Sequence, residues 1–364
     1  NAGATGNNTA VGHIAGRRLT TGIENNIIGA LAGSSLTDAD DNVAVGYAAL
    51  ATDTKGNRTT AIGRLAAYNQ NFTSSTDTNN VYIGYYAGAD ATTGLRNTIV
   101  GSLGAEELTT ADDSVGIGYL CLGGNAGSAT TGHDNVCVGS TSGSALTTGG
   151  QNVYIGQQAA YNATTGGANV CIGFKAGAVT TLLGTGGTNT LIGSYTHSTT
   201  TDASSSVGLG HSLSCATGYA TIGHGGQDIR AAHGNTTWST VSDERYKKDI
   251  VDSTAGLSFI NDLRPRTFKY KNLGELPNTF NSYEEGSTEV FKNANTNHGF
   301  IAQEVKTVIN AHSEIKDGFR LWDDRDDGSQ EIAETALIPV LVKALQELSA
   351  KNDALEARIK TLEG

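Results

Sequence analysis

Methionine is missing from this sequence, and proline and aromatic residues are scarce. There is no Met, and the three prolines, Pro265, Pro277 and Pro339, all lie in the last third of the chain. A chain without an initiator methionine is expected to be a fragment or a processed form of a longer protein, with an attachment region before Asn1. Only 38% of the 364 residues are apolar and 6% are aromatic, less than a compact globule of this length usually carries. The composition therefore argues against a single compact globule.

Positive charge and long apolar runs are also lacking. Lys and Arg number 24 against 36 Asp and Glu, which gives a net charge of -12 at pH 7. Nucleic-acid binding requires a basic stripe that releases counterions, so no nucleic-acid partner is expected. No apolar run approaches the roughly 20 residues of a membrane span, and the first residues lack the charged and apolar regions of a signal peptide. We expect no membrane insertion.

Cysteine is sparse, and its spacing is typical neither of a metal site nor of a disulfide framework. The four residues are Cys121, Cys137, Cys171 and Cys215. Free cysteine packs like a small hydrophobic residue, so we expect four buried thiols. No cofactor is expected.

Glycine, in contrast, is abundant and unevenly distributed. Of 48 glycines, 41 precede Ser242 and 7 follow it. The charge density changes at the same place, because residues 1–241 hold 14 Asp/Glu and 8 Lys/Arg, whereas residues 242–364 hold 22 and 16. We therefore place a domain boundary at Ser242.

A short signature ending in glycine recurs from Asn8 to Gly223. Its clearest copies open with asparagine, as in Asn42-Val43-Ala44-Val45-Gly46. A branched aliphatic residue stands before each final glycine, and Val or Thr usually stands two residues earlier. The final glycines recur at a nearly constant spacing, at Gly12, Gly29, Gly46, Gly63, Gly84, Gly101, Gly118, Gly139, Gly156, Gly173, Gly193, Gly210 and Gly223. Self-similarity at a fixed period indicates a stacked repeat architecture.

Each copy predicts one short strand followed by a turn. The period of two marks a strand whose aliphatic face points inward, and glycine ends the strand where the backbone turns or approaches a neighbour closely. Strands of successive repeats then pair laterally at about 4.8 Å. Two inward aliphatic residues per repeat bury little in one chain, so we expect a homotrimer that joins these small-residue faces around a shared axis.

The repeats resemble the left-handed parallel β-roll heads of trimeric autotransporter adhesins and the related repeats of phage tail fibres. This resemblance implies a mainly β fold, with a trimeric parallel β-roll or β-solenoid shaft of about 17-residue rungs. In such a stack Cys137 and Cys171 occupy the same rung position two periods apart, with Tyr154 between them and beyond disulfide reach.

The residue after each final glycine varies most, which suits an outward position used for recognition. The candidate receptor-binding residues are Tyr47, Tyr85, Tyr119, His211 and His224, and simple surface variation is the alternative interpretation. His211 and His224 lie on consecutive rungs and could hold a metal on a threefold axis. No third ligand is evident, so no metal is expected.

A different pattern begins at Ser242. Residues 242–250 fit Ser-Asp-x-Arg-x-Lys-x-x-Ile, and residues 263–270, 298–305 and 337–348 supply further matching pieces in order. These segments resemble the endosialidase-type intramolecular chaperone, the self-cleaving module at the end of many phage tailspikes, fibres and neck appendages. The resemblance spans residues 242–364 and implies a small α+β chaperone domain that ends in a long coiled-coil helix.

By that resemblance Ser242 is the nucleophile and Lys247 the base for cleavage of the bond between Val241 and Ser242. The base must be a neutral amine, whereas an ordinary lysine has a pKa of about 10.4. Burial in an assembled trimer, together with Arg245, would favour the neutral form, and Asp243 would oppose it. Five residues place Ser242 and Lys247 on opposite faces of a strand, so a bend or another subunit must bring them together. Self-cleavage is the only enzymatic activity that we expect.

Two further features belong to the C-terminal part. His298 and Gln303 lie where a strand is expected to enter a helix and are candidates for supporting polar roles, with a structural cap or turn as the alternative. Apolar residues then recur at 3-4 spacing, completed by Asn352, at Ile338, Leu341, Leu345, Leu348, Leu355, Ile359 and Leu362. This pattern predicts a coiled-coil helix over residues 333–364, in which Asn352 sets the register. Three-strandedness rests on the resemblance, since Ile and Leu at these positions favour a dimer.

These patterns divide the chain into a repeat shaft (1–225), a linker (226–241), a chaperone core (242–332) and a C-terminal helix (333–364). We expect a receptor-binding and structural fibre protein of a phage or phage-like particle, made in the host cytoplasm and built into the virion. Its expected partners are further copies of itself, upstream fibre or baseplate proteins, and a host cell-surface glycan or protein. The alternatives are a bacterial trimeric adhesin and a fragment of a tailspike glycan depolymerase, although the shaft carboxylates are sparse for glycosidase chemistry.

Overall fold

The structure is a computed structural model that describes residues 6–125, 127–178, 184–315 and 319–363. The chain divides into two compact units, Asn1–Asp243 and Glu244–Gly364. Each unit has its own hydrophobic core, a long one within the repeats and a small one within the C-terminal unit. Among the described residues, no helix is both long enough and apolar enough to cross a membrane.

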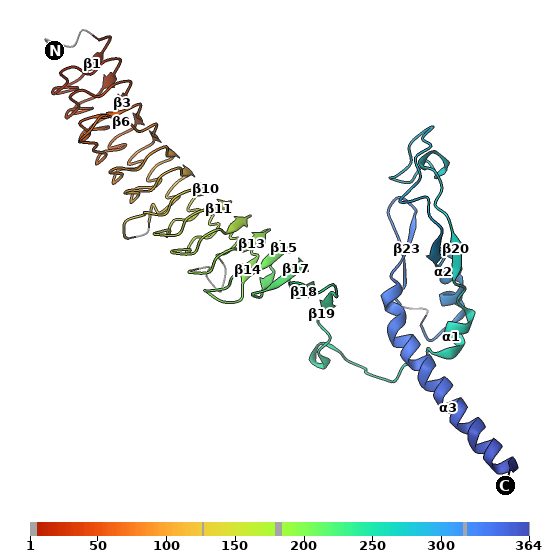
Figure 1. The fold of residues 1–364 in the computed structure, drawn as a ribbon. Coiled ribbons are helices and arrows are strands. Elements are labelled where there is room, and N and C mark those ends of the chain that lie inside the picture. Colours follow the sequence, from red (N-terminus) through yellow and green to blue (C-terminus); the bar gives the residue numbers. More distant parts are fainter. Residues whose placement is uncertain (1–5, 126, 179–183, 316–318, 364) are drawn as a thin grey trace. The chain divides into compact units, whose positions relative to one another are not determined.

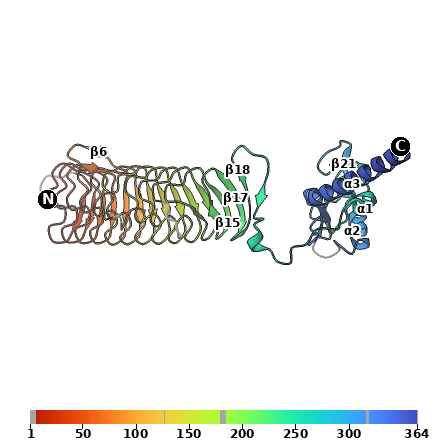
Figure 2. The ribbon, with the colours of Figure 1, turned by 90° about the horizontal axis from the view of Figure 1, so that it is seen from below.

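The first unit is a β-solenoid in which each turn of the chain adds one short strand to a continuous sheet (Figures 1 and 2). The 15-stranded sheet consists of β1 (Thr9–Val11), β2 (Asn26–Ile28), β3 (Val43–Val45), β5 (Thr60–Ile62), β7 (Val81–Ile83), β8 (Thr98–Val100), β9 (Val115–Ile117), β10 (Val136–Val138), β11 (Val153–Ile155), β12 (Val170–Ile172), β13 (Thr190–Ile192), β15 (Val207–His211), β17 (Tyr219–His224), β18 (Gln227–Ala232) and β19 (Ser239–Thr240). Two smaller sheets pair β4 (Gly56–Asn57) with β6 (Thr76–Asp77) and β14 (His197–Ser198) with β16 (Ser214–Cys215).

The strand register confirms the mainly β solenoid with about 17-residue rungs. Val43 lies opposite Thr60 on the next rung, and Thr60 lies opposite Val81 after a longer repeat. Longer repeats therefore place their extra residues in loops and keep the strands aligned. All pairings from β1 to β17 are parallel, whereas β18 and β19 join antiparallel. Residues 226–241, expected as a linker, thus contain two strands of the shaft sheet.

The rung glycine is required by both conformation and space. Gly139 has a φ of +132°, in the region that favours glycine, and a Cβ added there would lie 2.5 Å from the carbonyl oxygen of Gly156 on the next rung. Gly46 has the same φ, and its Cβ would lie 2.5 Å from the carbonyl oxygen of Gly63. The close approach and the turn that the sequence predicts at each glycine therefore occur together.

The interior of the solenoid is filled by the middle residue of each strand. Ile27, Tyr82 and Leu191 are fully buried at this position. The prediction that the aliphatic residue before each glycine points inward is wrong for the single chain, because Ile28 and Ile155 are 43% and 37% exposed. The two flanking side chains face outward, and buried loop residues, among them Leu36, Leu50 and Leu122, fill the rest of the coil.

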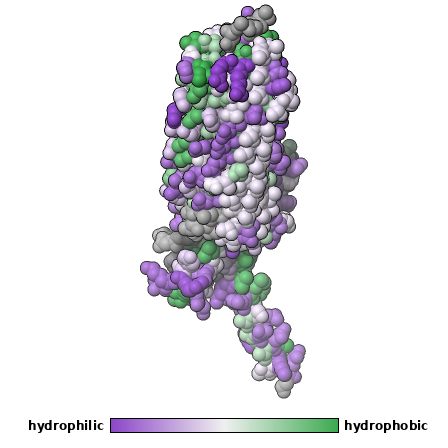
Figure 3. Space-filling view, turned by 90° about the vertical axis from the view of Figure 1, so that its left-hand side faces the viewer, coloured by the Kyte–Doolittle hydropathy of each residue, from purple (hydrophilic) through white to green (hydrophobic). Residues whose placement is uncertain are grey.

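We call the residues before the rung glycines the aliphatic stripe. It comprises Val11, Ile28, Val45, Ile62, Ile83, Val100, Ile117, Val138, Ile155, Ile172, Ile192, Leu209 and Ile222. They are exposed or half-buried and lie side by side along the parallel sheet. The face of the shaft seen in Figure 3 is, by comparison, mostly polar or weakly polar, with apolar residues gathered towards one edge.

The cysteines behave as expected from the sequence. All four are free and buried, and the register places Tyr154 between Cys137 and Cys171. Burial raises the pKa of the Cys121 thiol and of the Cys171 thiol to about 12. Thiols that stay protonated are poor nucleophiles, so these residues serve packing.

The second unit is small and mixed in structure (Figure 1). Its helices are α1 (Leu257–Asp262), α2 (Ala302–Ala311) and α3 (Ile338–Glu363), with short 3-10 helices η1 (Glu244–Tyr246), η2 (Leu273–Glu275) and η3 (Glu334–Leu337). Its strands are β20 (Arg266–Phe268) with β21 (Asn297–Gly299), and β22 (Trp322–Asp324) with β23 (Gln330–Ile332), both pairs antiparallel. The terminal helix predicted from residue 333 therefore begins as a 3-10 turn and becomes α-helical at Ile338.

The core of the second unit joins α1, α2 and the start of α3. Phe259, Val305 and Val340 are buried together there. The side chain of His312 closes one edge, with Nε2 2.8 Å from Asp262 Oδ2 and Nδ1 2.9 Å from Glu314 Oε1. The rest of α3 leaves this core, so only Val340 and Ala344 of the helix are buried.

Candidate cleavage and recognition sites

The predicted scissile bond lies on the surface directly after the shaft sheet. Val241 and Ser242 are exposed, and Val241 follows β19. The β19 strand is held by β18, with Thr240 opposite Ile229 and Ser239 opposite Arg230. Cleavage before Ser242 would thus leave the last shaft strand paired.

The predicted base lies just beyond a turn of the chain. Lys247 follows η1, and its backbone N–H donates to the carbonyl oxygen of Glu244 at 2.8 Å. A 3-10 turn therefore stands between Ser242 and Lys247, which is the kind of bend that their spacing requires. Asp243 is half-buried at the end of the first unit, and Arg245 is exposed within η1.

The exposed segment around Lys247 carries three large apolar side chains among its charged residues. Tyr246, Ile250 and Val251 are 81%, 67% and 86% exposed, and no residue from 244 to 254 is buried. Exposed apolar groups of this size mark a surface that a partner covers. The burial that favours a neutral lysine is not supplied by the single chain, so assembly would have to supply it.

The two predicted supporting residues lie in the second unit. His298 is exposed on β21, where its Nδ1 is 3.4 Å from Thr267 Oγ1. Gln303 is in the first turn of α2 and lines a cavity of about 1160 Å³. His298 is not among the described residues that line this cavity, so the structure gives the two side chains different surroundings.

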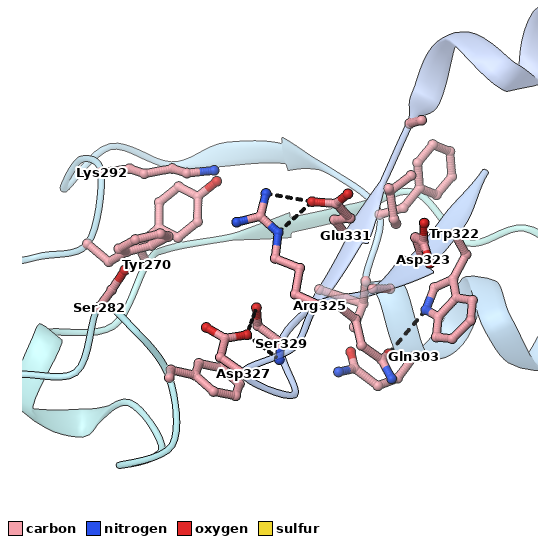
Figure 4. A pocket seen from close by; sticks show the side chains of 18 of the residues that line it. Tyr270, Ser282, Lys292, Gln303, Trp322, Asp323, Arg325, Asp327, Ser329 and Glu331 are labelled. Atoms are coloured by element: carbon pink, nitrogen blue, oxygen red, sulfur yellow. Dashed lines mark hydrogen bonds and ion pairs between the residues drawn. The ribbon is translucent and has the colours of Figure 1, made fainter. Parts of the chain in front are cut away.

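Sequence reasoning did not predict this cavity, which Figure 4 shows from close by. Its wall is aromatic, formed by Phe268, Tyr270, Phe280, Phe291, Phe300 and Trp322. The signal in the sequence was the crowding of aromatic residues between 268 and 322, in a chain that is otherwise poor in them.

The polar groups of the cavity are mostly paired with one another. Arg325 forms an ion pair with Glu331, and Trp322 Nε1 donates to Gln330 Oε1 at 3.2 Å (Figure 4). The backbone N–H of Asn281 and the hydroxyl of Ser329 lower the pKa of Asp327 to about 2. Asp327 is therefore held in the ionised form, and the cavity offers a ligand both aromatic rings and polar or charged side chains.

The predicted recognition residues stack on the shaft in what we call the post-glycine column, the residues that directly follow the rung glycines. Tyr47, Tyr85 and Tyr119 are each about half exposed in this column. Backbone bonds connect its members to the next rung, since the carbonyl oxygens of Tyr47 and Tyr85 accept at 2.9 Å and 2.8 Å. The column is therefore a continuous surface.

His211 and His224 end the column as a stacked pair. Their ring centroids are 4.9 Å apart, and the rings are inclined by 12°. Within the described residues, no group of three or more His, Cys, Asp or Glu side chains could hold a metal ion. The geometry of the pair is that of ring stacking between neighbouring rungs.

A second feature of the shaft is a shallow cavity of about 680 Å³, lined by polar residues of successive rungs that include Asp90 and Glu107. Asn69 Nδ2 donates to Asp90 Oδ1 at 2.9 Å, and the N–H of Ser128 donates to Glu107 Oε2 at 3.1 Å. Burial, together with the charges of Asp90 and Glu107, raises the pKa of Glu106 beside it. The shaft carboxylates are sparse in the sequence, whereas rung stacking brings these acidic residues together.

Comparison with known proteins bears on the C-terminal unit. Residues 242–313 match the protein family described as chaperone of endosialidase. The match begins at Ser242 and extends through α2. No curated protein and no solved structure matches the chain.

The chain therefore combines a β-solenoid of about 17-residue rungs with an endosialidase-type chaperone domain. This combination is consistent with a phage tail fibre or tailspike that carries an intramolecular chaperone.

Proposed function

We propose that this chain is the distal part of a trimeric phage fibre, whose shaft binds a host surface and whose chaperone is released by cleavage before Ser242. One observation carries the proposal. The shaft sheet ends at Thr240, and the buried hydrophobic core of the second unit begins at Ala255. Between them lies a largely exposed segment that contains the family motif from Ser242. A cut there separates two folded units without breaking either.

The chemistry that we propose needs only groups of this segment. Neutral Lys247 takes the proton of Ser242 Oγ, and Oγ attacks the carbonyl carbon of Val241. The bond from that carbon to the Ser242 nitrogen breaks, the nitrogen takes up the proton, and an ester remains. Water hydrolyses the ester to a Val241 carboxylate and restores the Ser242 hydroxyl, now beside a free amine.

Trimerisation is supported by two exposed apolar seams, one in each unit. The aliphatic stripe runs along the shaft, and Leu345, Leu348 and Leu355 of α3 are each more than half exposed. A chain that exposed both seams would be prone to association, whereas three chains around a shared axis bury them. Release of the chaperone after assembly would leave the shaft kinetically trapped, because it could not retrace a path that needed the chaperone.

Cleavage is tested with the full chain produced under folding conditions. Wild type should yield a fragment whose N-terminal residue is Ser242, whereas Ser242→Ala and Lys247→Ala should leave a full-length chain that still forms trimers. The matched controls are Ser253→Ala and Lys248→Ala, which remove the same groups from nearby exposed positions. N-terminal sequencing and denaturing gels give the readout. The dyad assignment would be wrong if wild type stayed intact, or if the Ser242→Ala and Lys247→Ala variants were cleaved as well as wild type.

A glycan depolymerase is the second candidate function, and the polar cavity of the shaft favours it. Glycosidases pair a carboxylic acid of raised pKa with an ionised carboxylate, and Glu106 lies beside Asp90 and Glu107. An active shaft would release reducing sugar from host polysaccharide, and Glu106→Gln would abolish the release. A shaft that binds cells without releasing sugar is an adhesive fibre.

A further inference from the structure

Arg64 stands in the post-glycine column in the middle of three tyrosines. Its guanidinium carbon is 5.6 Å from the ring centroids of Tyr47 and Tyr85, and 5.5 Å from that of Tyr86. Its Nη1 donates to the hydroxyls of Tyr85 at 3.3 Å and Tyr86 at 3.4 Å. These residues come from β3, β5 and β7 rungs, so the cluster exists only in the stacked shaft.

The charge of Arg64 is not neutralised by a neighbouring carboxylate. Elsewhere on the shaft Lys55, Arg58 and Arg96 form ion pairs with aspartates. Among the described residues, no carboxylate lies within 4.0 Å of the Arg64 guanidinium, which is exposed. A guanidinium with N–H donors directed to solvent binds carboxylates well, because its planar fork matches their two oxygens.

The tyrosines supply the other half of a sugar site. Tyr47 and Tyr85 are about half exposed and present flat apolar faces with a hydroxyl at the edge. Stacking with Arg64 holds the rings in place, so little conformational freedom is lost when a ligand binds. A pyranose ring has an apolar C–H face and polar edges, and it fits such a surface.

A second cluster of a cation and aromatic rings lies farther along the shaft, around Phe174 of the column. Lys175 Nζ is 5.4 Å from the Phe174 ring centroid and 5.9 Å from that of Tyr195. The strands from β8 to β11 lie between the two clusters in one continuous sheet. A single sugar needs one cluster, whereas a linear polymer can contact both.

We propose that the Arg64 cluster binds a carboxylate-bearing sugar of a linear cell-surface polysaccharide, with the Lys175 cluster as a second contact on the same polymer. This inference rests on the proposed role of the shaft in binding a host surface, and it names the class of ligand. Arg64 binds the carboxylate, and the rings of Tyr47 and Tyr85 stack on the sugar.

The test measures adsorption of the fluorescently labelled, trimeric shaft to a panel of bacterial strains. Reduction of the cell-surface carboxyl groups to alcohols, with carbodiimide and borohydride, should abolish adsorption. Arg64→Gln should weaken it at least about tenfold, which is the effect of losing one charge-assisted contact. Tyr85→Ala should weaken it as well, whereas Tyr85→Phe keeps the ring and should bind like wild type.

The matched control is Arg17→Gln, which removes an equal charge from an exposed position outside the column. It should bind like wild type. If wild type adsorbs and Arg64→Gln adsorbs equally, or if binding survives carboxyl reduction, the inference is wrong while the proposed function stands. If Arg64→Gln loses the trimer in light scattering, the cluster is an interface between chains, and the inference also fails. If wild type adsorbs to no strain, the proposed function itself fails.

Discussion

Single asparagines organise the buried polar groups of the shaft. Asn152 Nδ2 donates to the carbonyl oxygen of Gly166 at 3.0 Å, and its Oδ1 accepts from the N–H of Asn169 at 3.0 Å. The same bonds recur at Asn42, whose Oδ1 accepts from the next rung at 2.8 Å. A buried N–H without an acceptor is costly, so in most rungs one such amide satisfies groups that the coil removes from water.

Loss of one such amide should destabilise the shaft measurably. Asn152→Ala leaves the N–H of Asn169 and the carbonyl of Gly166 without their partner, which costs about 1–3 kcal/mol for each buried group. The midpoint of denaturant unfolding of the shaft should fall accordingly. Asn162→Ala, in a turn of the same rung, should leave the midpoint close to wild type. Equal unfolding midpoints for the two variants would contradict the stabilising role of the stacked asparagines.

At the scale of elements, His312 connects the end of α2 to α1. Hydrogen bonds to the carboxylate of Asp262, and to a smaller extent to that of Glu314, raise the pKa of His312 above its usual value. The imidazole also packs edge-on against Phe259 of α1, with ring centroids 5.3 Å apart. The protonated ring can donate to both carboxylates at once, so its charge joins elements that are distant in sequence.

This contact predicts how the stability of the second unit depends on pH. A histidine whose pKa is raised by folding contributes stability that is fully present below its unfolded pKa, about 6.5, and is lost as pH rises through the folded pKa. The melting temperature of the unit should therefore fall as the pH rises above about 6.5. His312→Gln should remove most of this slope. Fluorescence of Trp322 in a Trp238→Phe, Ser242→Ala chain reports the unit, and an unchanged slope in His312→Gln would assign the dependence to other groups.

The terminal helix shows the same division between inner and outer faces. Val340 and Ala344 pack into the unit, whereas Leu341, Leu345 and Leu348 are exposed. Asn352, predicted to set the register, donates to Glu356 Oε1 at 2.9 Å in the single chain. In a coiled coil the exposed leucines would be covered by partner helices, so this face of the helix would contribute to association while Val340 and Ala344 pack into the unit.

At the scale of the whole molecule, the apolar surface that the single chain leaves exposed is concentrated in long seams. The aliphatic stripe extends from Val11 to Ile222, and no residue of it is fully buried. Its members are aliphatic and lie in register, so copies of the chain can pack along it. A shaft held in this way would keep its association after removal of the chaperone.

A charge in the stripe should therefore separate the shaft trimer once the chaperone is gone. Ile155→Asp places three carboxylates near a shared axis, and such a buried unpaired charge costs several kcal/mol. The uncleaved variant should still assemble through its chaperone, but its cleaved shaft should dissociate in light scattering. Thr165→Asp adds the same charge to an exposed turn of the same rung and should stay trimeric. A trimeric Ile155→Asp shaft would place the axis on another face.

Much of the molecule follows from local patterns in its sequence. The rung glycines, the opening asparagines and the aliphatic residues predict the strands and their register, because strands that repeat at nearly constant spacing can pair in only one way. The motif from Ser242 to Ile250 indicates the chaperone, which the family comparison confirms for residues 242–313. The roles of Ser242 and Lys247 stay predictions.

The direction of the strand faces could be learned only from the tertiary structure. An alternation of period two distinguishes two faces of a strand, but it does not say which face turns into the coil. The curvature of the solenoid decides this, and it places Tyr82 and Cys137 inside and the aliphatic stripe outside. The Arg64 cluster and the aromatic cavity of the second unit depend on the same level of structure. Their members come from separate rungs or separate elements of the chain. Only folding brings these side chains together, so no local pattern in the sequence predicts the distances between them.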